Sequence, residues 1–209
     1  MGRTAGRSPE ETRQGILDAA TALIARRGIS VSLTEIARAA GVSKGGLIYH
    51  FPSKEVLVHA GALALFERFR SAVEGAAADE PADEPGRLAR AYIRVSFADA
   101  SGSGDDLREL IAVAAQLMAD DTVRDLADAD GARWRADLAA DGLPPAVVRM
   151  IVAATDGVSS APLWGQILQA DDRDALEREL VAMTRVAQPP ASGASVGRSA
   201  DGAGGAARR

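Results

Sequence analysis

The stretch LTEIARAAGVSKGGLIYHFPSKEVL, residues 33–57, decides the fold that we expect for this chain. It predicts two short helices, over residues 32–41 and 43–51, because each begins at a serine that can cap a helix. The first helix stops at a glycine, and the second stops before a proline that cannot continue it. Only Val42 separates the two, so a tight turn is expected to join them.

A longer helix precedes this pair, and another follows it. Residues 8–27 begin with Ser8 and place Glu11 three positions later, which is the spacing of a capping box. Apolar residues then recur at helical spacing up to Gly28, a typical stop. Beyond the proline, Ser53 is placed to cap a long helix. One long helix followed by two short, closely joined helices is the pattern of a helix-turn-helix unit.

The paired glycines Gly45 and Gly46 stand where the second short helix begins, although glycine is a poor helix former. In a helix-turn-helix unit, the second helix enters the major groove of DNA with its first residues at the base edges. Glycines there let the helix start approach the DNA backbone closely. The N–H groups from Ser43 onward attract phosphate, and Lys44 adds a positive charge.

The rest of the second helix divides into polar and apolar positions. Tyr49 and His50 offer hydrogen bonds to DNA, whereas Leu47 and Phe51 are expected to pack the helix onto its two predecessors. Lys54 brings a further positive charge and a further helix start beside the same phosphates. The segment therefore predicts a double-stranded DNA operator as a partner.

Residues 10–60 closely resemble the DNA-binding segment of the tetracycline-repressor (TetR) family of bacterial transcriptional regulators. The resemblance rests on the order of Ile36-Ala37, Ala40-Gly41-Val42-Ser43, Phe51 and Lys54-Glu55. It implies an all-helical protein whose three N-terminal helices bind DNA and whose larger C-terminal domain binds a small molecule and dimerises. Carried over position by position, it implies DNA contacts near Thr34, Lys44, Gly45, Tyr49, His50 and Lys54.

One position departs from the family pattern. The family often has tyrosine where this chain has Ile48, and here the tyrosine is Tyr49. A shift of one residue turns a side chain by roughly 100° around a helix. Tyr49 is therefore expected to reach a different phosphate or a thymine methyl group, and the sequence leaves open whether Ile48 packs inward or touches a base.

Composition narrows the function further. The net charge is −5, but residues 1–60 hold eight Lys and Arg against five Asp and Glu, so the DNA-binding segment is basic within an acidic chain. There is no cysteine, and the two histidines lack metal-ligand spacing, so we expect no metal site and no cofactor. No catalytic constellation appears, and an enzyme is not expected. Without a signal peptide or a membrane-length apolar run, we expect a cytoplasmic protein with no membrane partner.

About nine helices are expected in all. Beyond the four described above, the apolar spacing predicts helices over residues 86–99, 105–119, 121–141, 145–169 and 173–187. We divide the chain into a DNA-binding domain (1–55), a helical ligand-binding and dimerisation domain (56–187) and a disordered tail (188–209). The last two helices are the most apolar pair, and the resemblance implies that their family equivalents form the dimer interface. Leu180 and Ile167 are expected there.

The pocket for the small molecule is the least readable part. Its expected residues are Phe66, Tyr92, Leu110, Met118, Leu126, Asp130, Trp134 and Asp156. A carboxylate on an apolar helix face needs a partner, and a carboxylate beside an aromatic ring suits an organic cation. Asp130 and Asp156 also fit salt-bridged or exposed structural residues, and the aromatic residues also fit a plain core. A neutral lipophilic ligand therefore stays an alternative.

Two functions remain open. The first is a repressor that binds a pseudo-palindromic operator as a homodimer and is released by a small lipophilic, possibly cationic, ligand. The second is a DNA-binding regulator without a small-molecule effector, whose C-terminal domain serves only for dimerisation.

Overall fold

The computed structural model describes residues 7–101, 121–165 and 167–186. Within these ranges it contains no strand and eight helices: α1 (Pro9–Arg27), α2 (Leu33–Ala39), α3 (Lys44–His50), α4 (Lys54–Ala77), α5 (Arg87–Ser101), α7 (Asp121–Ala140), α8 (Pro145–Trp164) and α9 (Ala170–Val186). The all-α fold class expected from the sequence is confirmed. The helix predicted over residues 105–119 and the tail predicted from residue 188 lie outside the described residues.

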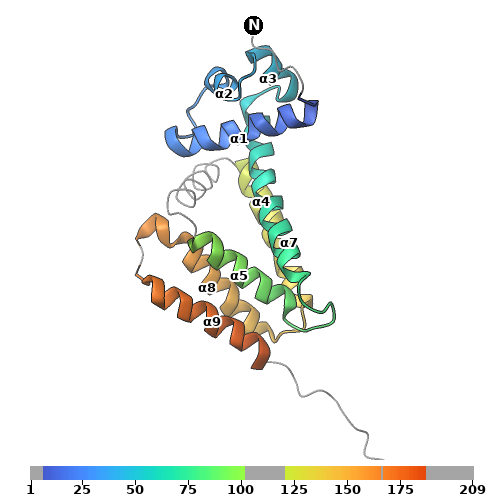
Figure 1. Ribbon diagram of the computed structural model, residues 1–209, viewed down its shortest axis with the longest axis vertical. Helices are drawn as coiled ribbons and strands as arrows, with labels where there is room; N and C mark the ends of the chain where they lie inside the picture. The colour runs from blue at the N-terminus through green and yellow to red at the C-terminus, as the bar shows by residue number, and fades with distance from the viewer. Residues whose placement is uncertain (1–6, 102–120, 166, 187–209) are drawn as a thin grey trace, which may run out of the picture.

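The helices form two groups that α4 connects. Helices α1, α2 and α3 gather at one end of the molecule, and α5, α8 and α9 lie together at the other (Figure 1). The long helix α4 runs from the first group into the second, and α7 lies along it. The position of α4 therefore determines how the two groups are held relative to each other.

Serine caps fix the starts of the first four helices. Ser8 Oγ accepts a hydrogen bond from the Glu11 N–H, and the Glu11 carboxylate accepts one from the Ser8 N–H. A second capping box joins Ser32 and Glu35 in the same way. Ser43 and Ser53 cap α3 and α4 through the N–H groups three residues further on. The four predicted helix starts are confirmed because each is encoded within four residues.

The first group packs around its own small core, which we call the N-terminal core. Its buried members are Ile16, Leu17, Ala20, Val31, Ile36, Ala37, Leu47, Phe51 and Leu57. Leu47 and Phe51 contribute the inner face of α3 and are fully buried, as predicted. Helix α3 is thus anchored by two large buried side chains and not by its glycines, which are poor helix formers.

Helix α4 contributes to three clusters in succession. Leu57 belongs to the N-terminal core. Val58 and Ala62 belong to a junction cluster that also contains Ile24 of α1 and Val123 of α7. Further along, α4 enters the main core of the second group, the C-terminal core. The domain boundary placed at residues 55 and 56 remains a prediction, because a single continuous helix serves both groups.

A buried ion pair holds the far end of the C-terminal group. Arg90 of α5 is 1% exposed, and its Nε donates to the Glu80 carboxylate at 2.6 Å. Its Nη1 also donates to the Pro85 carbonyl and to the Thr184 hydroxyl of α9. Gly86 lies against this guanidinium with a positive φ of 76°. One side chain therefore joins the α4–α5 connection to α9.

The last two helices differ from the prediction at their facing ends. Helix α8 ends at Trp164 and not at residue 169, because Gly165 takes a φ of 101° that ends the helix. Ile167 consequently lies outside the helix and is 91% exposed. Leu180 is buried in the C-terminal core of its own chain, so its expected place in a dimer interface was wrong. The apolar face of α9 therefore packs into the core of its own protomer.

Candidate functional site

Helix α3 is held by side-chain contacts at both of its ends, and its first residues are exposed to solvent. Ser43 Oγ accepts a hydrogen bond from the Gly46 N–H at 3.0 Å, which closes the first turn. At the other end, the guanidinium of Arg13 from α1 lies 4.9 Å from the centroid of the Phe51 ring. This contact between α1 and the end of α3 has no local sequence signal, because 38 positions separate the two residues.

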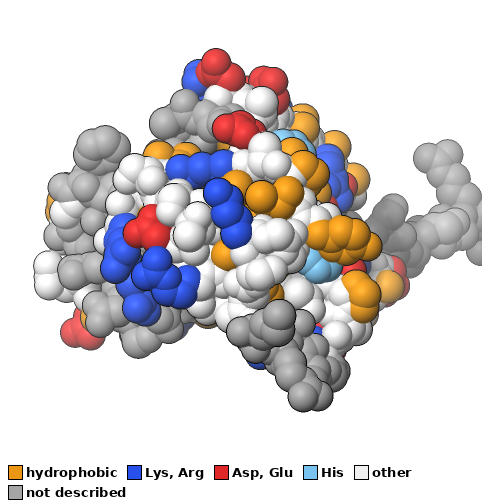
Figure 2. Space-filling view, turned by 90° about the horizontal axis from the view of Figure 1, so that it is seen from above, with side chains coloured by type: hydrophobic (Ala, Val, Ile, Leu, Met, Phe, Trp, Pro, Cys, Tyr) orange, Lys and Arg blue, Asp and Glu red, His pale blue; other side chains and the backbone are white. Residues whose placement is uncertain are grey.

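The outer face of α3 presents polar and apolar groups to solvent. Tyr49 is 83% exposed, and its ring meets His50 edge-on at 5.2 Å. Ile48 is 40% exposed, so it faces outward instead of packing in the core. Figure 2 looks onto this end of the molecule, where basic, histidine and apolar side chains share the surface. Such a mixed surface can contact both phosphates and base edges.

The structure brings the eight predicted DNA-binding residues onto α2, α3 and the start of α4. Exposed among them are Thr34, Ser43, Lys44, Gly45 and Tyr49, and half-buried are Gly46, His50 and Lys54. Two helix N-termini, those of α3 and α4, carry a lysine at their first position. Their N–H groups and lysines provide positive charge for an anionic backbone.

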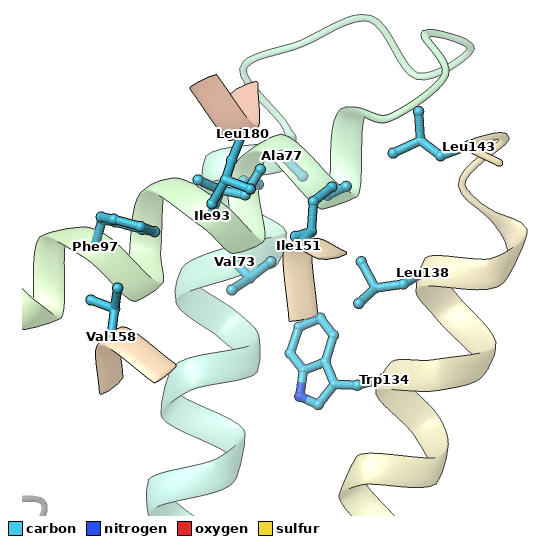
Figure 3. Close-up of a cluster of buried hydrophobic side chains, with 12 residues drawn as sticks. Val73, Ala77, Ile93, Phe97, Trp134, Leu138, Leu143, Ile151, Val158 and Leu180 are labelled. Atoms are coloured by element: carbon cyan, nitrogen blue, oxygen red, sulfur yellow. The ribbon is translucent and has the colours of Figure 1, made fainter. Parts of the chain in front are cut away.

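A second constellation lies between α4, α5 and α7. The rings of Phe69, Tyr92 and Trp134 pack edge to face, with centroid separations of 5.1–5.7 Å. Trp134 projects from α7 into the C-terminal core beside Val73 of α4 and Ile151 of α8 (Figure 3). Tyr92 and Trp134 were predicted as pocket residues and do meet. Phe69 was missed, although its place on α4 three residues after Phe66 and four before Val73 could have signalled an inward face.

Arg70 occupies the aromatic face that the sequence suggested for a ligand cation. Its guanidinium carbon lies 4.0 Å from the Trp134 ring centroid. The same guanidinium pairs with Asp137 at 2.6 Å and with Asp130 at 3.4 Å. Burial would lower the pKa of Arg70, but its hydrogen bond to Asp137 and the charge of Asp130 outweigh that effect and raise it. Asp130 is therefore a salt-bridged residue, which was the structural alternative.

Asp156 differs from Asp130 in having no ion-pair partner among the described residues. Partial burial raises the pKa of its carboxyl group. The pKa of Tyr92 is raised by burial first and by the negative charge of Asp156 next, while a hydrogen bond with Thr155 lowers it. The phenol of Tyr92 and the carboxylate of Asp156 are thus electrostatic neighbours at the edge of the aromatic cluster.

The other predicted pocket residues lie elsewhere. Phe66 and Leu126 pack against the junction cluster with Ile24, Val58 and Val123. Leu110 and Met118 lie outside the described residues. The eight residues proposed from sequence therefore do not form one group. The aromatic cluster itself contains two of them, Tyr92 and Trp134. Two more, Asp130 and Asp156, lie beside it.

An apolar groove of about 400 Å³ runs along α8 and α9. Small residues form much of its floor, among them Ala153, Gly157 and Ala161 of α8. Ile167 and Leu168, from the connection to α9, line one end and are exposed. Small side chains let another helix approach closely, so this face can pack against further helices.

No three potential metal-ligating side chains lie together in the part of the chain that the structure describes. None of the described helices is long and apolar enough to span a membrane.

Comparison with protein families accounts for both groups of helices. Residues 16–60 match the model of bacterial regulatory proteins of the tetR family. Residues 86–185 match the model of a tetracyclin repressor-like C-terminal domain. This chain belongs to the TetR family. The family consists of transcriptional regulators and is not an enzyme class.

Curated relatives of this TetR-family chain match over only part of its length. The regulator AcrR of Shigella flexneri is 47% identical over 58 residues, which are 27% of each chain. BetI of Rhizobium meliloti (strain 1021) is 38% identical over 86 residues, 41% of each chain. The match thus spans less than half of the length of either relative.

Solved structures match over nearly the whole chain. The multidrug binding protein EbrR, in complex with malachite green, is 27% identical, with a TM-score of 0.62 over 85% of this chain and 98% of that one. GusR of Salmonella enterica is 22% identical, with a TM-score of 0.58 over 86% of this chain and 98% of that one. The second likeness shows a shared fold.

Proposed function

We propose that this protein is a ligand-responsive repressor that binds a pseudo-palindromic operator as a homodimer. The observation that carries the proposal is the way α3 is packed. Its inner residues Leu47 and Phe51 are fully buried, whereas Lys44, Gly45 and Tyr49 are exposed. A helix held in this way can enter the major groove with its N-terminal residues at the base edges. Such a regulator acts where bacterial DNA is, in the cytoplasm.

In this proposal, the eight residues on α2, α3 and α4 have distinct roles. The N–H groups and lysines at the two helix starts bind phosphate and fix the register on the duplex. Tyr49 and Ile48, both exposed on α3, reach toward the bases. An apolar Ile48 side chain suits the methyl group of thymine.

We place the dimer interface on the groove of α8 and α9. Its small-residue floor and its exposed apolar end suit two further helices from a second copy. A methyl group added at Gly157 meets no atom within 4 Å in the protomer. Gly157→Glu should therefore fold normally and yet dissociate the dimer in analytical ultracentrifugation. A variant that folds and stays dimeric would move the interface elsewhere.

The effector in this proposal is a lipophilic small molecule that reaches the aromatic cluster. EbrR, which is complexed with malachite green, supports an effector that packs against aromatic rings. Asp156, without an ion-pair partner among the described residues and next to Tyr92, favours a positively charged group on that molecule. Release follows if the ligand binds more tightly to the form of the protein that does not fit the operator.

Selection from genomic DNA tests this function. Immobilised full-length protein is incubated with sheared DNA of its source bacterium, and the retained fragments are sequenced. We expect enrichment of a short pseudo-palindrome whose half-sites lie about one helical turn, roughly 10 base pairs, apart. Retention without any shared sequence would contradict the proposal.

The alternative, a regulator without an effector, is separated by a second step. The operator complex is titrated with chemically diverse lipophilic cations, neutral molecules and carboxylates while DNA anisotropy is followed. Release by at least one class at low concentration supports the leading proposal. Operator binding that no compound alters favours a C-terminal domain that serves only for dimerisation.

A further inference from the structure

The face of Trp134 is already occupied by a cation from the chain itself. Arg70 stacks on the ring with its guanidinium carbon 4.0 Å from the centroid, and its side chain is only 7% exposed. Guanidinium and organic ammonium or phosphonium groups are attracted to an aromatic face for the same reason, the negative potential of the ring. The contact is therefore also a model of how this face binds a foreign cation.

Helix α7 supplies the whole of the site that receives this cation. Asp130, Trp134 and Asp137 follow one another at spacings of four and three residues, which places them on one face of the helix. Both carboxylates pair with Arg70, at 3.4 and 2.6 Å. An aromatic face between two acidic groups recognises positive charge and an apolar body together.

The cation that fills the site comes from the helix that connects the two groups. Arg70 lies on α4, whose earlier turns place Leu57 in the N-terminal core and Val58 in the junction cluster. Contact between Arg70 and α7 therefore bears on a helix that also packs in both of these clusters. A change at Trp134 can reach the DNA-binding end through one continuous helix.

Among the described residues, the buried guanidinium of Arg70 lacks one hydrogen-bond partner. Arg70 Nε is buried without a hydrogen-bond partner among the described residues. An unpaired buried donor carries a desolvation penalty, which makes Arg70 easier to replace than its two ion pairs alone would suggest. If Arg70 leaves, Asp130, only 16% exposed, keeps only Arg133 at 4.0 Å as a counter-charge, and Asp137 loses the partner that lies at 2.6 Å. A neutral or anionic molecule could not supply the missing counter-charge.

We propose that the Trp134 face between Asp130 and Asp137 is a binding site for an organic cation, which Arg70 fills when no such cation is present. A cation that takes the place of Arg70 frees α4 from α7 and so disfavours the arrangement that fits DNA. The inference rests on the proposed function for its consequence at the operator. The site itself is tested without DNA.

Tryptophan fluorescence gives a direct measurement. The chain has two tryptophans, so Trp164→Phe leaves Trp134 as the reporter. Full-length protein with this change is titrated with tetraphenylphosphonium, and separately with neutral triphenylphosphine oxide. We expect the cation to alter Trp134 emission saturably, and the neutral compound of similar shape to leave it unchanged.

Removing the internal cation should strengthen binding of the external one. Arg70→Met vacates the ring face, removes the ion-pair partner of Asp137 and leaves Asp130 with only Arg133 at 4.0 Å, so tetraphenylphosphonium should bind at least about tenfold more tightly. Arg70→Lys keeps a competing charge and should stay within about threefold of the parent. Arg94→Met is the matched control, because it makes the same exchange at an arginine whose ion-pair partner is Glu80 and neither of the two aspartates. Its affinity should be unchanged.

Two results would overturn the inference. One is equal or weaker cation binding by Arg70→Met whose far-UV circular dichroism matches the parent. The other is equal response to the cation and the neutral compound in the parent protein. If Arg70→Met does not fold, Arg70→Met with Asp130→Asn removes the buried carboxylate, and it should still bind the cation more tightly than the parent because the ring face is vacant and Asp137 remains. Because no DNA is present, failure here leaves the proposed repressor function standing, and absence of operator binding leaves this site standing.

Discussion

The two ends of the molecule are held by contacts of very different sequence range. At the DNA-facing end, the polar contacts that set the helices join residues three apart, as between Ser8 and Glu11 or between Ser43 and Gly46. In the C-terminal group, Arg70 reaches Asp137 across 67 positions and Arg90 reaches Thr184 across 94. The first end is therefore specified by short motifs, and the second by pairs that only the completed fold brings together.

This difference predicts how strongly single substitutions lower the stability of each end. A local cap supports one helix turn, so its loss is confined to that turn. A buried long-range ion pair joins several elements, and removal of one partner leaves an uncompensated charge inside the protein. We therefore expect single substitutions to unfold the C-terminal group more readily than the DNA-binding end.

The largest effect is expected for Arg90→Met. Glu80 would lose the partner that donates at 2.6 Å, and its carboxylate is only 18% exposed. The free energy of unfolding should fall by about 3 kcal/mol, as measured by urea denaturation. The control is Arg94→Met, which removes a 40% exposed partner of the same carboxylate and should cost less than about 1 kcal/mol. Equal effects of the two substitutions would refute the distinction.

The pH dependence of stability should report the same pair. The hydrogen bond from Arg90 holds the pKa of Glu80 below its usual value of 4.5, against the opposing effect of burial. A lowered folded-state pKa contributes stability that is present above pH 4.5 and is lost as the pH falls toward the folded value. In Arg90→Met this part of the acid-side loss should shrink. If the stability of Arg90→Met falls with decreasing pH as steeply as that of the parent, Arg90 is not the cause of the lowered pKa of Glu80.

A second pair of substitutions compares glycines of similar backbone conformation. Gly86 has a φ of 76°, and an added Cβ would lie 3.0 Å from Arg90 Nη1 and from Leu143 Cδ2. Gly41 has a φ of 69° with nothing within 4 Å. Gly41→Ala should cost about 1 kcal/mol from the backbone alone, and Gly86→Ala about 2–3 kcal/mol because crowding is added. Thermal denaturation of both variants measures the difference, and equal costs would rule out crowding.

Within the DNA-binding end, two lysines should behave differently. Lys44 begins α3 and Lys54 begins α4. Lys54→Ala should weaken operator and random DNA alike and reduce the salt slope by about one, as the loss of a phosphate contact does. Lys44→Ala should also change the preferred bases. Equal losses on operator and random DNA for both variants would remove a base-reading role for Lys44.

The smallest effect is expected at Asp156. Burial raises the pKa of its carboxyl group above the usual 3.8, so the folded state holds a proton more firmly than the unfolded chain does. Its contribution to stability therefore decreases as the pH rises from 3.8 through the raised value. Asp156→Asn should increase the thermal midpoint slightly at pH 7, with a smaller gain at lower pH. A decrease at pH 7 would indicate a stabilising partner for the carboxylate.

The sequence predicts the DNA-facing end well and the C-terminal group in part. Serine caps mark the starts of α1, α2 and α3, glycines follow the ends of α1 and α2, and a proline follows α3, because these signals act within a turn. The end of α8 was predicted five residues too late, since apolar residues continue past Gly165 and periodicity does not show its positive φ. The Arg70 contact was missed because its partners lie 60 and 67 residues away.

Gly45 gives the most direct test of the central claim that α3 is the DNA-contacting helix. A Cβ at this position would meet only Ser43 Oγ, at 4.0 Å, so Gly45→Ala fits the protein and should raise helix stability by up to about 1 kcal/mol. Gly75→Ala on α4 is the matched control, because it also adds a methyl group to an open helical position, away from the DNA-facing end. We predict that Gly45→Ala is at least as stable as the parent yet binds the operator more weakly in fluorescence anisotropy, while Gly75→Ala binds it normally. Operator affinity that is unchanged or increased in Gly45→Ala would contradict close approach of this helix to DNA.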